Sequence, residues 1–461
     1  MRIARREAVR EAVAVTVGVL LVAAAFALPR LNLGVRPRLD VGAEKFATHA
    51  GAAPIFGEWL IHAGWGTGPA IALAIAVVAW GPILAQRLSW RALTLGSWAT
   101  ACGWAFVLAM IDGWQRGFAG RLTTRDEYLS QVPSITDIGV TLRTFASRIV
   151  DYQPNSWTTH VSGHPPGALL TFVWLNRLGL HGGAWAGLLC LLAGSSAAAA
   201  VLIAVRALAD EPTARRAAPF VALAPTAIWV AVSADGYFAG VAAWGIALLA
   251  VAVHRPVRFP AMTAAGAGLL LGWGVFCNYG LMLMGLPALA VLASAQRPGN
   301  GWADWRAILR ALGPAALAAI AVAVAFAVAG FFWFDGYTLV QQRYWQGIAK
   351  DRPFQYWSWA NLACVVCAIG LGGVAGISRV FDWPAIRRRS GFHLLLLGLL
   401  AAVVFADLSM LSKAEVERIW LPFTIWLTAA AALLPVHAQR IWLALNAIGA
   451  LALNTVILTN W

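Results

Sequence analysis

The chain has 461 residues, of which 60% are hydrophobic and only 12% are charged. Soluble domains carry about 25% charged residues, so this composition excludes an ordinary soluble domain and indicates an integral membrane protein. The formal net charge of +14 comes mostly from arginines in short loops between apolar segments, a pattern typical of cytoplasmic loops of membrane proteins that does not indicate a nucleic-acid partner.

Apolar segments recur along the whole chain, and their lengths suit helical spans rather than the ~10-residue alternating strands of an outer-membrane barrel. We expect an all-α, polytopic transmembrane bundle of about 13 spans. The predicted spans cover about residues 12–28, 68–85, 92–111, 185–208, 217–232, 238–253, 262–276, 281–295, 311–332, 362–377, 393–405, 420–434 and 441–458. With the N-terminus in the cytoplasm, every short Arg-rich loop then lies on the cytoplasmic side.

The first apolar segment has two interpretations. A cleaved signal peptide could end near Ala25-Phe26-Ala27, but we favour an uncleaved first span because a multi-span protein needs this anchor. Residues 30–65 are then predicted to lie outside, before the second span.

The longest polar segment, residues 113–167, follows the third predicted span and is therefore expected on the external face. Ordering a long loop costs conformational entropy, and long loops between membrane helices are usually functional. Residues 168–180 are apolar but too few to cross the membrane, so we expect an interfacial helix there. The single membrane domain, 1–461, is divided into N-terminal spans (1–112), an external catalytic loop with its juxtamembrane helix (113–182) and the remaining spans (183–461).

Acidic, tyrosine and arginine residues gather at the predicted external ends of the spans. Ionisable groups are costly at membrane depth, so such residues normally line a polar cavity. Carboxylates accept hydrogen bonds from sugar hydroxyls and arginines pair with phosphate oxygens, which makes this cavity suited to a sugar and a phosphate. The candidate substrate-binding residues are Tyr128, His164, Asp235, Tyr237, Arg343, Arg352, Glu415, Glu417 and Arg418. Taken singly, each is also explained by the polarity of loops and the aromatic belts of membrane proteins.

The five cysteines are scattered, and only Cys364 and Cys367 form a CxxC pair. Because this pair lies within a predicted span, we interpret it as core packing rather than as a redox or metal motif.

One order of motifs resembles a known arrangement. Asp126-Glu127-Tyr128 is followed after about 35 residues by His164-Pro165-Pro166-Gly167 and a short apolar helix. This order resembles the first external loop of the GT-C superfamily, multi-span glycosyltransferases that use polyprenyl-phosphate-linked sugars. Protein O-mannosyltransferases and lipid A aminoarabinose transferases are members with such motifs. The segment 412–423, SKAEVERIWLPF, also looks like a late acidic–arginine segment of some actinobacterial membrane glycosyltransferases.

Two departures from the superfamily pattern bear on the subfamily. The Asp-Glu motif follows the third predicted span here rather than the first, so two spans are an N-terminal addition. Gly167 stands where many relatives have leucine.

The resemblance implies a glycosyltransferase of the bacterial plasma membrane that moves a sugar from a polyprenyl-phosphate donor to a glycan, lipid or protein on the external face. Asp126 would be the base and Glu127 would organise the acceptor or a metal. Arg418, with Arg343, Arg352 or Lys350, would hold the leaving phosphate. His164 would contact substrate or fix Asp126. Use of a divalent cation, Mg²⁺ or Mn²⁺, stays open.

Other functions share some of these features. A transporter or flippase for a lipid-linked or small polar substrate is the main alternative, but such proteins usually carry broken helices and charges near mid-span. A polymerase or ligase that uses lipid-linked donors would share most features of the proposed enzyme. An ATP-driven pump is disfavoured because the chain lacks a GxxxxGK[ST] motif.

Overall fold

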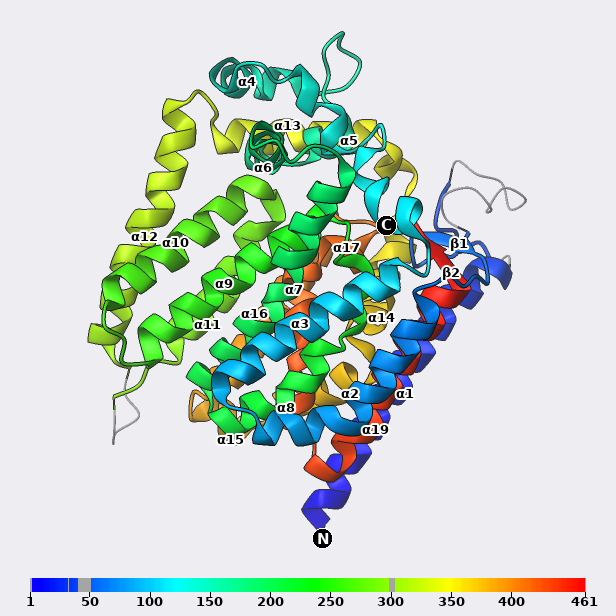
Figure 1. Cartoon of the computed structure of the whole chain (residues 1–461), viewed down its shortest axis with the longest axis vertical. Coiled ribbons are helices and arrows are strands. Elements are labelled where there is room, and N and C mark those ends of the chain that lie inside the picture. Colours follow the sequence, from blue (N-terminus) through cyan, green and yellow to red (C-terminus); the bar gives the residue numbers. More distant parts are fainter. Residues whose placement is uncertain (1, 32, 40–50, 298–302, 461) are drawn as a thin grey trace.

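The structure is a computed structural model that describes residues 2–31, 33–39, 51–297 and 303–460. Residues 40–50 of the predicted external segment 30–65 lie outside this description. Figure 1 shows a helical bundle with a layer of short helices at one end. The predicted polytopic, all-α membrane architecture is confirmed.

Nine helices in the described part of the chain are long and apolar enough to cross a membrane. They correspond to nine of the predicted spans. In a membrane a long apolar segment forms a continuous helix, because the helix satisfies all of its backbone hydrogen bonds internally. These helices are α1 (Arg2–Ala27), α2 (Thr67–Arg87), α3 (Trp90–Ala109), α7 (Gly183–Leu208), α9 (Ala234–His254), α10 (Pro260–Cys277), α12 (Trp305–Val328), α14 (Phe354–Val380) and α16 (Gly391–Leu408).

The other four predicted spans have a different form. The helix α19 (Val436–Val456) has 21 residues but is less apolar. The remaining three are short helices joined to 3-10 turns, namely α8 (Glu211–Ala222) with η8 (Pro225–Trp229), η9 (Tyr279–Met284) with α11 (Gly285–Ala293), and α17 (Val416–Ile419) with α18 (Leu421–Leu427) and η11 (Thr428–Leu433). Residues 420–432 are all buried, so this broken segment is surrounded by protein. That all four cross the membrane stays a prediction.

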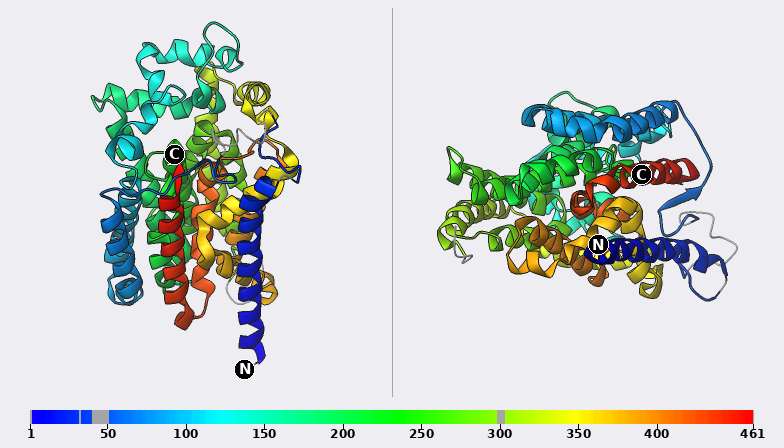
Figure 2. Two further views of the ribbon diagram at one scale, coloured as in Figure 1. Left: turned by 90° about the vertical axis from the view of Figure 1, so that its right-hand side faces the viewer. Right: turned by 90° about the horizontal axis from the view of Figure 1, so that it is seen from below.

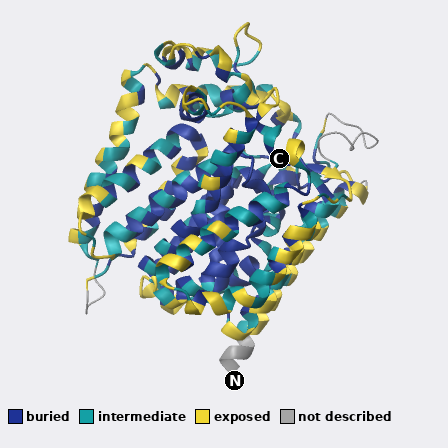
Figure 3. Cartoon of the chain, in the orientation of Figure 1, coloured by how far each residue is buried: buried dark blue, intermediate teal, exposed yellow. Residues whose placement is uncertain are grey.

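Burial separates the inner helices from the outer ones. Most residues of α7, α9 and α14 are buried, whereas α1, α2 and α12 are apolar but largely exposed. Figure 3 shows the buried residues at the centre of the bundle. Exposed apolar helices in a membrane protein face lipid, so α1, α2 and α12 form part of the lipid-facing surface.

The inner helices α7 and α9 approach each other through small residues. A Cβ atom on Gly240 would lie 2.1 Å from the carbonyl oxygen of Ala193, and one on Gly194 would lie 2.8 Å from that of Gly236. Only glycine permits this approach, which is a common way to pack membrane helices. The contact fixes the first turn of α9, which carries Asp235, against the first half of α7.

The short helices gather at one end, which we call the loop end. They include α4 (Ile138–Thr144), α5 (Thr159–Gly163), α6 (Pro166–Arg177) and α13 (Trp333–Gln346), drawn at the top of Figure 1. The helix α6 stands where an interfacial helix was expected. The N-terminus, α8 and α15 (Trp383–Arg387) lie at the opposite end.

A small antiparallel sheet joins two distant parts of the chain. Strand β1 (Gly57–Trp59) pairs with β2 (Ile457–Thr459), with Gly57 opposite Thr459. Figure 2 shows that β2 continues α19 up to the loop end and that α1 lies at the edge of the bundle. Residues 457–458, which were expected to end the last span, belong instead to β2.

Candidate functional site

The Asp-Glu motif sits in the loop between two 3-10 turns, with its two side chains in different surroundings. The Asp126 carboxylate is exposed and accepts a hydrogen bond from the Thr159 hydroxyl at 3.2 Å. The Glu127 side chain is buried, and its Oε1 lies 3.6 Å from Nδ1 of His160. The backbone N–H of His160 donates to the Asp126 carbonyl at 3.0 Å. The start of α5 is therefore fastened to the motif.

Tyr128 and His164 form the support behind this motif. The Tyr128 ring stacks on Phe172 of α6 at 5.2 Å between centroids and meets the His164 ring edge-on at 5.8 Å. His164 Nδ1 lies 2.8 Å from the carbonyl oxygen of His160. Burial lowers the pKa of His164 to about 4, so this histidine is neutral at physiological pH. Both residues hold the loop on α6 rather than presenting polar atoms to solvent.

Arg418 on α17 is the centre of a buried ion-pair cluster. Its Nη1 donates to Asp235 Oδ2 at 2.5 Å and its Nη2 to Glu415 Oε2 at 3.0 Å. The side chains of Arg418 and Asp235 are 6% and 1% exposed, so the pair is shielded from water. Burial works to lower the pKa of Arg418, but the two carboxylates outweigh it and raise that pKa. The guanidinium is therefore permanently charged.

Glu415 joins Arg418 to a second arginine. Its Oε1 accepts a hydrogen bond from Arg352 Nη2 at 2.8 Å, and Arg352 Nη1 donates to the Lys413 carbonyl, also at 2.8 Å. Burial works to raise the pKa of Glu415, but the guanidinium groups of Arg352 and Arg418 lower it to about 2. Ala414 and Glu415 have φ of 67° and 61°. Such left-handed conformations cost about 1–3 kcal/mol each and persist where surrounding contacts hold them.

The loop motif and this cluster lie within electrostatic reach of each other. Glu127 contributes to the raised pKa of Arg418. His160 contributes to the lowered pKa of Glu415. The site thus combines the loop at 126–128, the start of α5, the first turn of α9 and the segment 413–418. These segments are up to about 290 residues apart in the sequence.

Two candidate residues, Tyr237 and Arg343, have neighbours outside this cluster. The Tyr237 hydroxyl accepts a hydrogen bond from Trp273 at 2.9 Å, and Arg343 pairs with Asp151 and donates to Ser162 at 3.2 Å. Both residues lie on the face predicted to be external, but neither contacts Arg418 among the described hydrogen bonds and ion pairs. Arg343 thus links α13 to Asp151 and to Ser162 of α5, and Tyr237 of α9 contacts Trp273 of α10.

Glu417 also departs from the expectation of substrate contact. Its side chain is 0% exposed, and its Oε1 accepts a hydrogen bond from the Phe56 N–H at 2.8 Å. Glu417 and Arg418 are adjacent in α17, and a helix turns by about 100° from one residue to the next. Glu417 and Arg418 therefore face different neighbours.

Two residues near the site were not among the candidates. His160 lies next to Glu127 and within electrostatic reach of Glu415. Arg121 lies within electrostatic reach of Glu127 and Arg418. Burial, followed by the charge of Arg116, lowers the pKa of Arg121 to about 10, so it stays charged at neutral pH. In the sequence, both residues could have been found from their closeness to the motifs: His160 lies four residues before His164, and Arg121 lies six residues before Glu127.

The part of the chain that the structure describes has no group of three or more His, Cys, Asp or Glu side chains suited to one metal ion. Asp126 and Glu127 alone would need substrate oxygens or water to complete a cation site.

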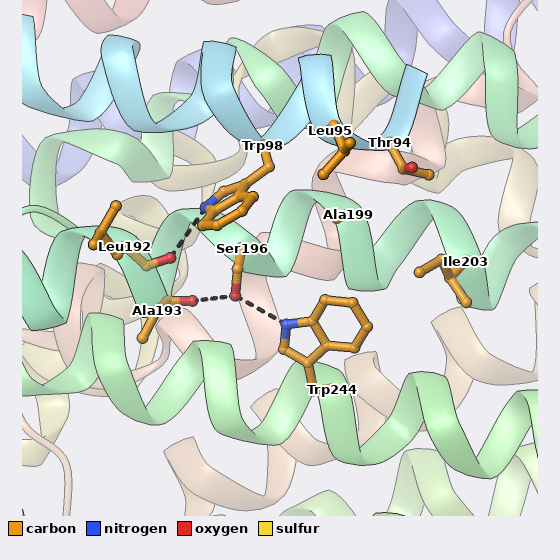
Figure 4. A pocket seen from close by; sticks show the side chains of 9 residues that line it. All are labelled: Thr94, Leu95, Trp98, Leu192, Ala193, Ser196, Ala199, Ile203 and Trp244. Atoms are coloured by element: carbon orange, nitrogen blue, oxygen red, sulfur yellow. Dashed lines mark hydrogen bonds between the residues drawn. The ribbon is translucent and has the colours of Figure 1, made fainter. Parts of the chain in front are cut away.

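A pocket of about 500 Å³ lies apart from this cluster, between α3, α7 and α9 (Figure 4). Its walls are mostly apolar. The Trp98 indole donates to the Leu192 carbonyl at 3.1 Å, and the Trp244 indole donates to Ser196 at 2.9 Å. The polar groups of the pocket thus bond to their neighbours, and the candidate site residues are absent from its lining.

Neither the protein-family models nor the curated protein sequences that we searched match this chain. Solved structures do. The oligosaccharyltransferase of Archaeoglobus fulgidus in the apo form is 14% identical with a TM-score of 0.53, and the match covers 79% of this chain and 56% of that one. The complex of that enzyme with Zn and sulfate is 15% identical with a TM-score of 0.51, covering 79% and 53%. ArnT from Cupriavidus metallidurans in the apo state is 18% identical with a TM-score of 0.44, covering 71% and 57%.

The chain spans about half the length of the solved proteins that it matches. At this level of identity, the similarity to oligosaccharyltransferase concerns the fold. That enzyme is a membrane glycosyltransferase of the GT-C superfamily, so the GT-C resemblance is confirmed as a shared fold.

Proposed function

We propose that this chain is a membrane glycosyltransferase that moves a sugar from a polyprenyl-phosphate-linked donor to an acceptor hydroxyl on a glycan, lipid or protein. The observation that carries the proposal is the buried Arg418 cluster within electrostatic reach of the Asp-Glu motif, at the loop end of a GT-C fold. One side of the site offers an exposed carboxylate, and the other offers fixed positive charge.

Asp126 is the proposed base. Its carboxylate is exposed, so an acceptor hydroxyl can reach it, and the hydrogen bond from Thr159 fixes its direction. As the acceptor oxygen bonds to the anomeric carbon, its proton passes to Asp126 and the bond from that carbon to the phosphate oxygen breaks. Glu127 positions the motif through His160.

Arg418 and Arg121 are proposed to stabilise the negative charge that develops on the leaving phosphate. Such charge is stabilised best by groups that are already fixed before reaction, because no reorganisation is then needed. Asp235 and Glu415 fix the Arg418 guanidinium. Arg121 donates to the Thr459 carbonyl at 3.2 Å, which holds it at the same end of the bundle. Arg352 supports Glu415 rather than the phosphate itself.

Transfer from polyprenyl-phosphate sugars by the purified chain in detergent tests this mechanism. Asp126→Asn is expected to lower kcat by about 10²–10⁴-fold while the KM for donor stays nearly unchanged, because a neutral amide cannot accept the proton. Asp137→Asn is the matched control, since Asp137 lies in the same loop and caps α4 through Val140, a role that asparagine fills equally well.

Two results would contradict the assignment. Full transfer activity in Asp126→Asn removes this residue as the base. Movement of intact lipid-linked sugar between the leaflets of vesicles, without any transfer, would favour the transporter alternative. Release of free polyprenyl phosphate only when an acceptor is present is the expected positive result.

The loop end is proposed to face the outside of the cell. In a background without the five native cysteines, Ser130→Cys is expected to react in intact cells with a membrane-impermeant maleimide. Arg87→Cys, at the far end of α2, is the control and should react only after the cells are broken. The reverse pattern would place the site in the cytoplasm.

A further inference from the structure

Two side chains from different helices hold one short strip of backbone beside the proposed site. Glu417 of α17 accepts a hydrogen bond from the Phe56 N–H at 2.8 Å. Cys364 of α14 donates its thiol hydrogen to the Pro54 carbonyl at 3.3 Å between sulfur and oxygen. Both side chains are fully buried. Residues 54–56 are therefore fastened to the bundle at two points.

The two side chains also face each other. Glu417 lies within electrostatic and hydrogen-bonding reach of the Cys364 thiol. Because that thiol gives its hydrogen to Pro54, the second carboxyl oxygen of Glu417 receives none, and it has no hydrogen-bond partner among the described residues. A buried carboxylate oxygen without a partner is costly. A protonated Glu417 removes this cost by donating to the Cys364 sulfur, which completes a chain from Glu417 through Cys364 to Pro54.

The fastened strip touches the ion-pair cluster directly. The guanidinium carbon of Arg352 lies 5.6 Å from the centroid of the Phe56 ring. The carbonyl of Phe56 accepts a hydrogen bond from the Asn460 N–H at 3.0 Å, next to the sheet of β1 and β2. A displaced Phe56 would remove one wall of the Arg352 site.

We propose that Glu417 and Cys364 form a two-point clasp on residues 54–56 that positions Arg352, and through it Glu415, for the transfer reaction. Glu417 is a positioning residue, because its neighbours are backbone and thiol rather than substrate. This inference rests on the proposed function for its effect on the reaction, but the clasp itself is a property of the folded chain. It also gives the CxxC pair a role beyond core packing, carried by Cys364 alone.

The clasp depends on protonation. Burial raises the pKa of Glu417 to about 7. On α17 the charge of Glu415 acts in the same direction and that of Arg418 in the opposite one. On α14 the titratable neighbours are Cys364 and Cys367. Above pH 7 the clasp carries a buried negative charge that cannot donate to sulfur, so it is expected to loosen as the pH rises.

Thiol reactivity tests the clasp without any transfer assay. In a full chain that keeps only Cys364, maleimide is expected to react roughly tenfold faster after Glu417→Ala, because the loss of buried hydrogen bonds opens the strip more often. Glu417→Gln keeps an acceptor for Phe56 and gains a donor toward sulfur, so its labelling should stay as slow as in the parent. Equal rates in the parent and in Glu417→Ala would overturn the clasp.

If Glu417→Ala fails to fold, the pH dependence of Glu417→Gln decides. Between pH 6 and pH 8.5, thiol ionisation raises the labelling rate of Cys364 in both proteins. The rise should be larger in the parent than in Glu417→Gln. Matching pH profiles would overturn the proton dependence. The transfer assay tests the role of the clasp in the reaction separately. If Cys364 is labelled slowly in the parent, but the parent and Glu417→Gln have the same kcat above pH 7, the clasp exists and has no role in the reaction.

Discussion

The buried cluster at the loop end and the pocket between α3, α7 and α9 make opposite use of polar groups. In the cluster, charges from α9, residue 352 and the segment 415–418 neutralise one another across long sequence separations. In the pocket, each indole donates to a serine or carbonyl of the adjacent helix α7. The cluster therefore holds fixed charge, whereas the pocket offers volume and apolar surface.

The largest effect is expected from breaking the cluster. Arg418→Gln leaves Asp235 as an uncompensated buried charge, which typically costs about 3–5 kcal/mol of stability. The variant should unfold at a clearly lower temperature in detergent and lose transfer activity. Arg440→Gln is the control, because Arg440 is exposed and donates only to a carbonyl.

A double variant separates stability from function. Adding Asp235→Asn to Arg418→Gln removes the buried negative charge and is expected to recover most of the lost stability but none of the activity. Thermal unfolding followed by tryptophan fluorescence measures the first, and transfer the second. Recovered activity would show that Arg418 does not act on the phosphate.

The stability of the clasp should vary with pH. A folded-state pKa of about 7 for Glu417, against about 4.3 when unfolded, means that the folded state holds the proton more tightly. Its contribution is therefore fully present below about pH 4.3 and is lost as the pH rises toward 7. Glu417→Gln has no such loss and should be more stable than the parent at pH 8, by about 4 kcal/mol at most. A constant difference between pH 4.5 and pH 8 would contradict this assignment.

The smallest effect is expected in the pocket. Ala199→Leu fills part of a space of about 500 Å³ without removing a hydrogen bond. Stability should change by less than about 1 kcal/mol, and kcat should stay within about twofold of the parent. A strong loss of transfer with intact folding would instead show that the pocket holds part of the donor lipid. The pocket would then belong to the reaction, as the cluster is proposed to do.

The structure brings some of the predicted site residues together and separates others, for a physical reason. Asp126, Glu127 and Arg418 each belong to a short sequence pattern, and the structure brings the two patterns within electrostatic reach of each other. Glu417 lies in the same pattern as Arg418, yet it bonds to Phe56 because adjacent helix positions face different neighbours. Arg343 and Arg352 were expected to hold phosphate, but nearby carboxylates pair with both.

Composition and hydropathy by themselves determined that this chain is a helical membrane protein, where its long helices lie and which loop is polar enough to carry chemistry. These properties depend on local residue type, because every backbone group in a bilayer must be satisfied within its own helix. Only the tertiary structure decided which charges meet, since Arg418 and Asp235 are separated by 183 residues. It also decided that β1 pairs with β2 and that Cys364 and Glu417 hold the same strip of backbone, because contacts between distant segments depend on helix packing and not on the local pattern.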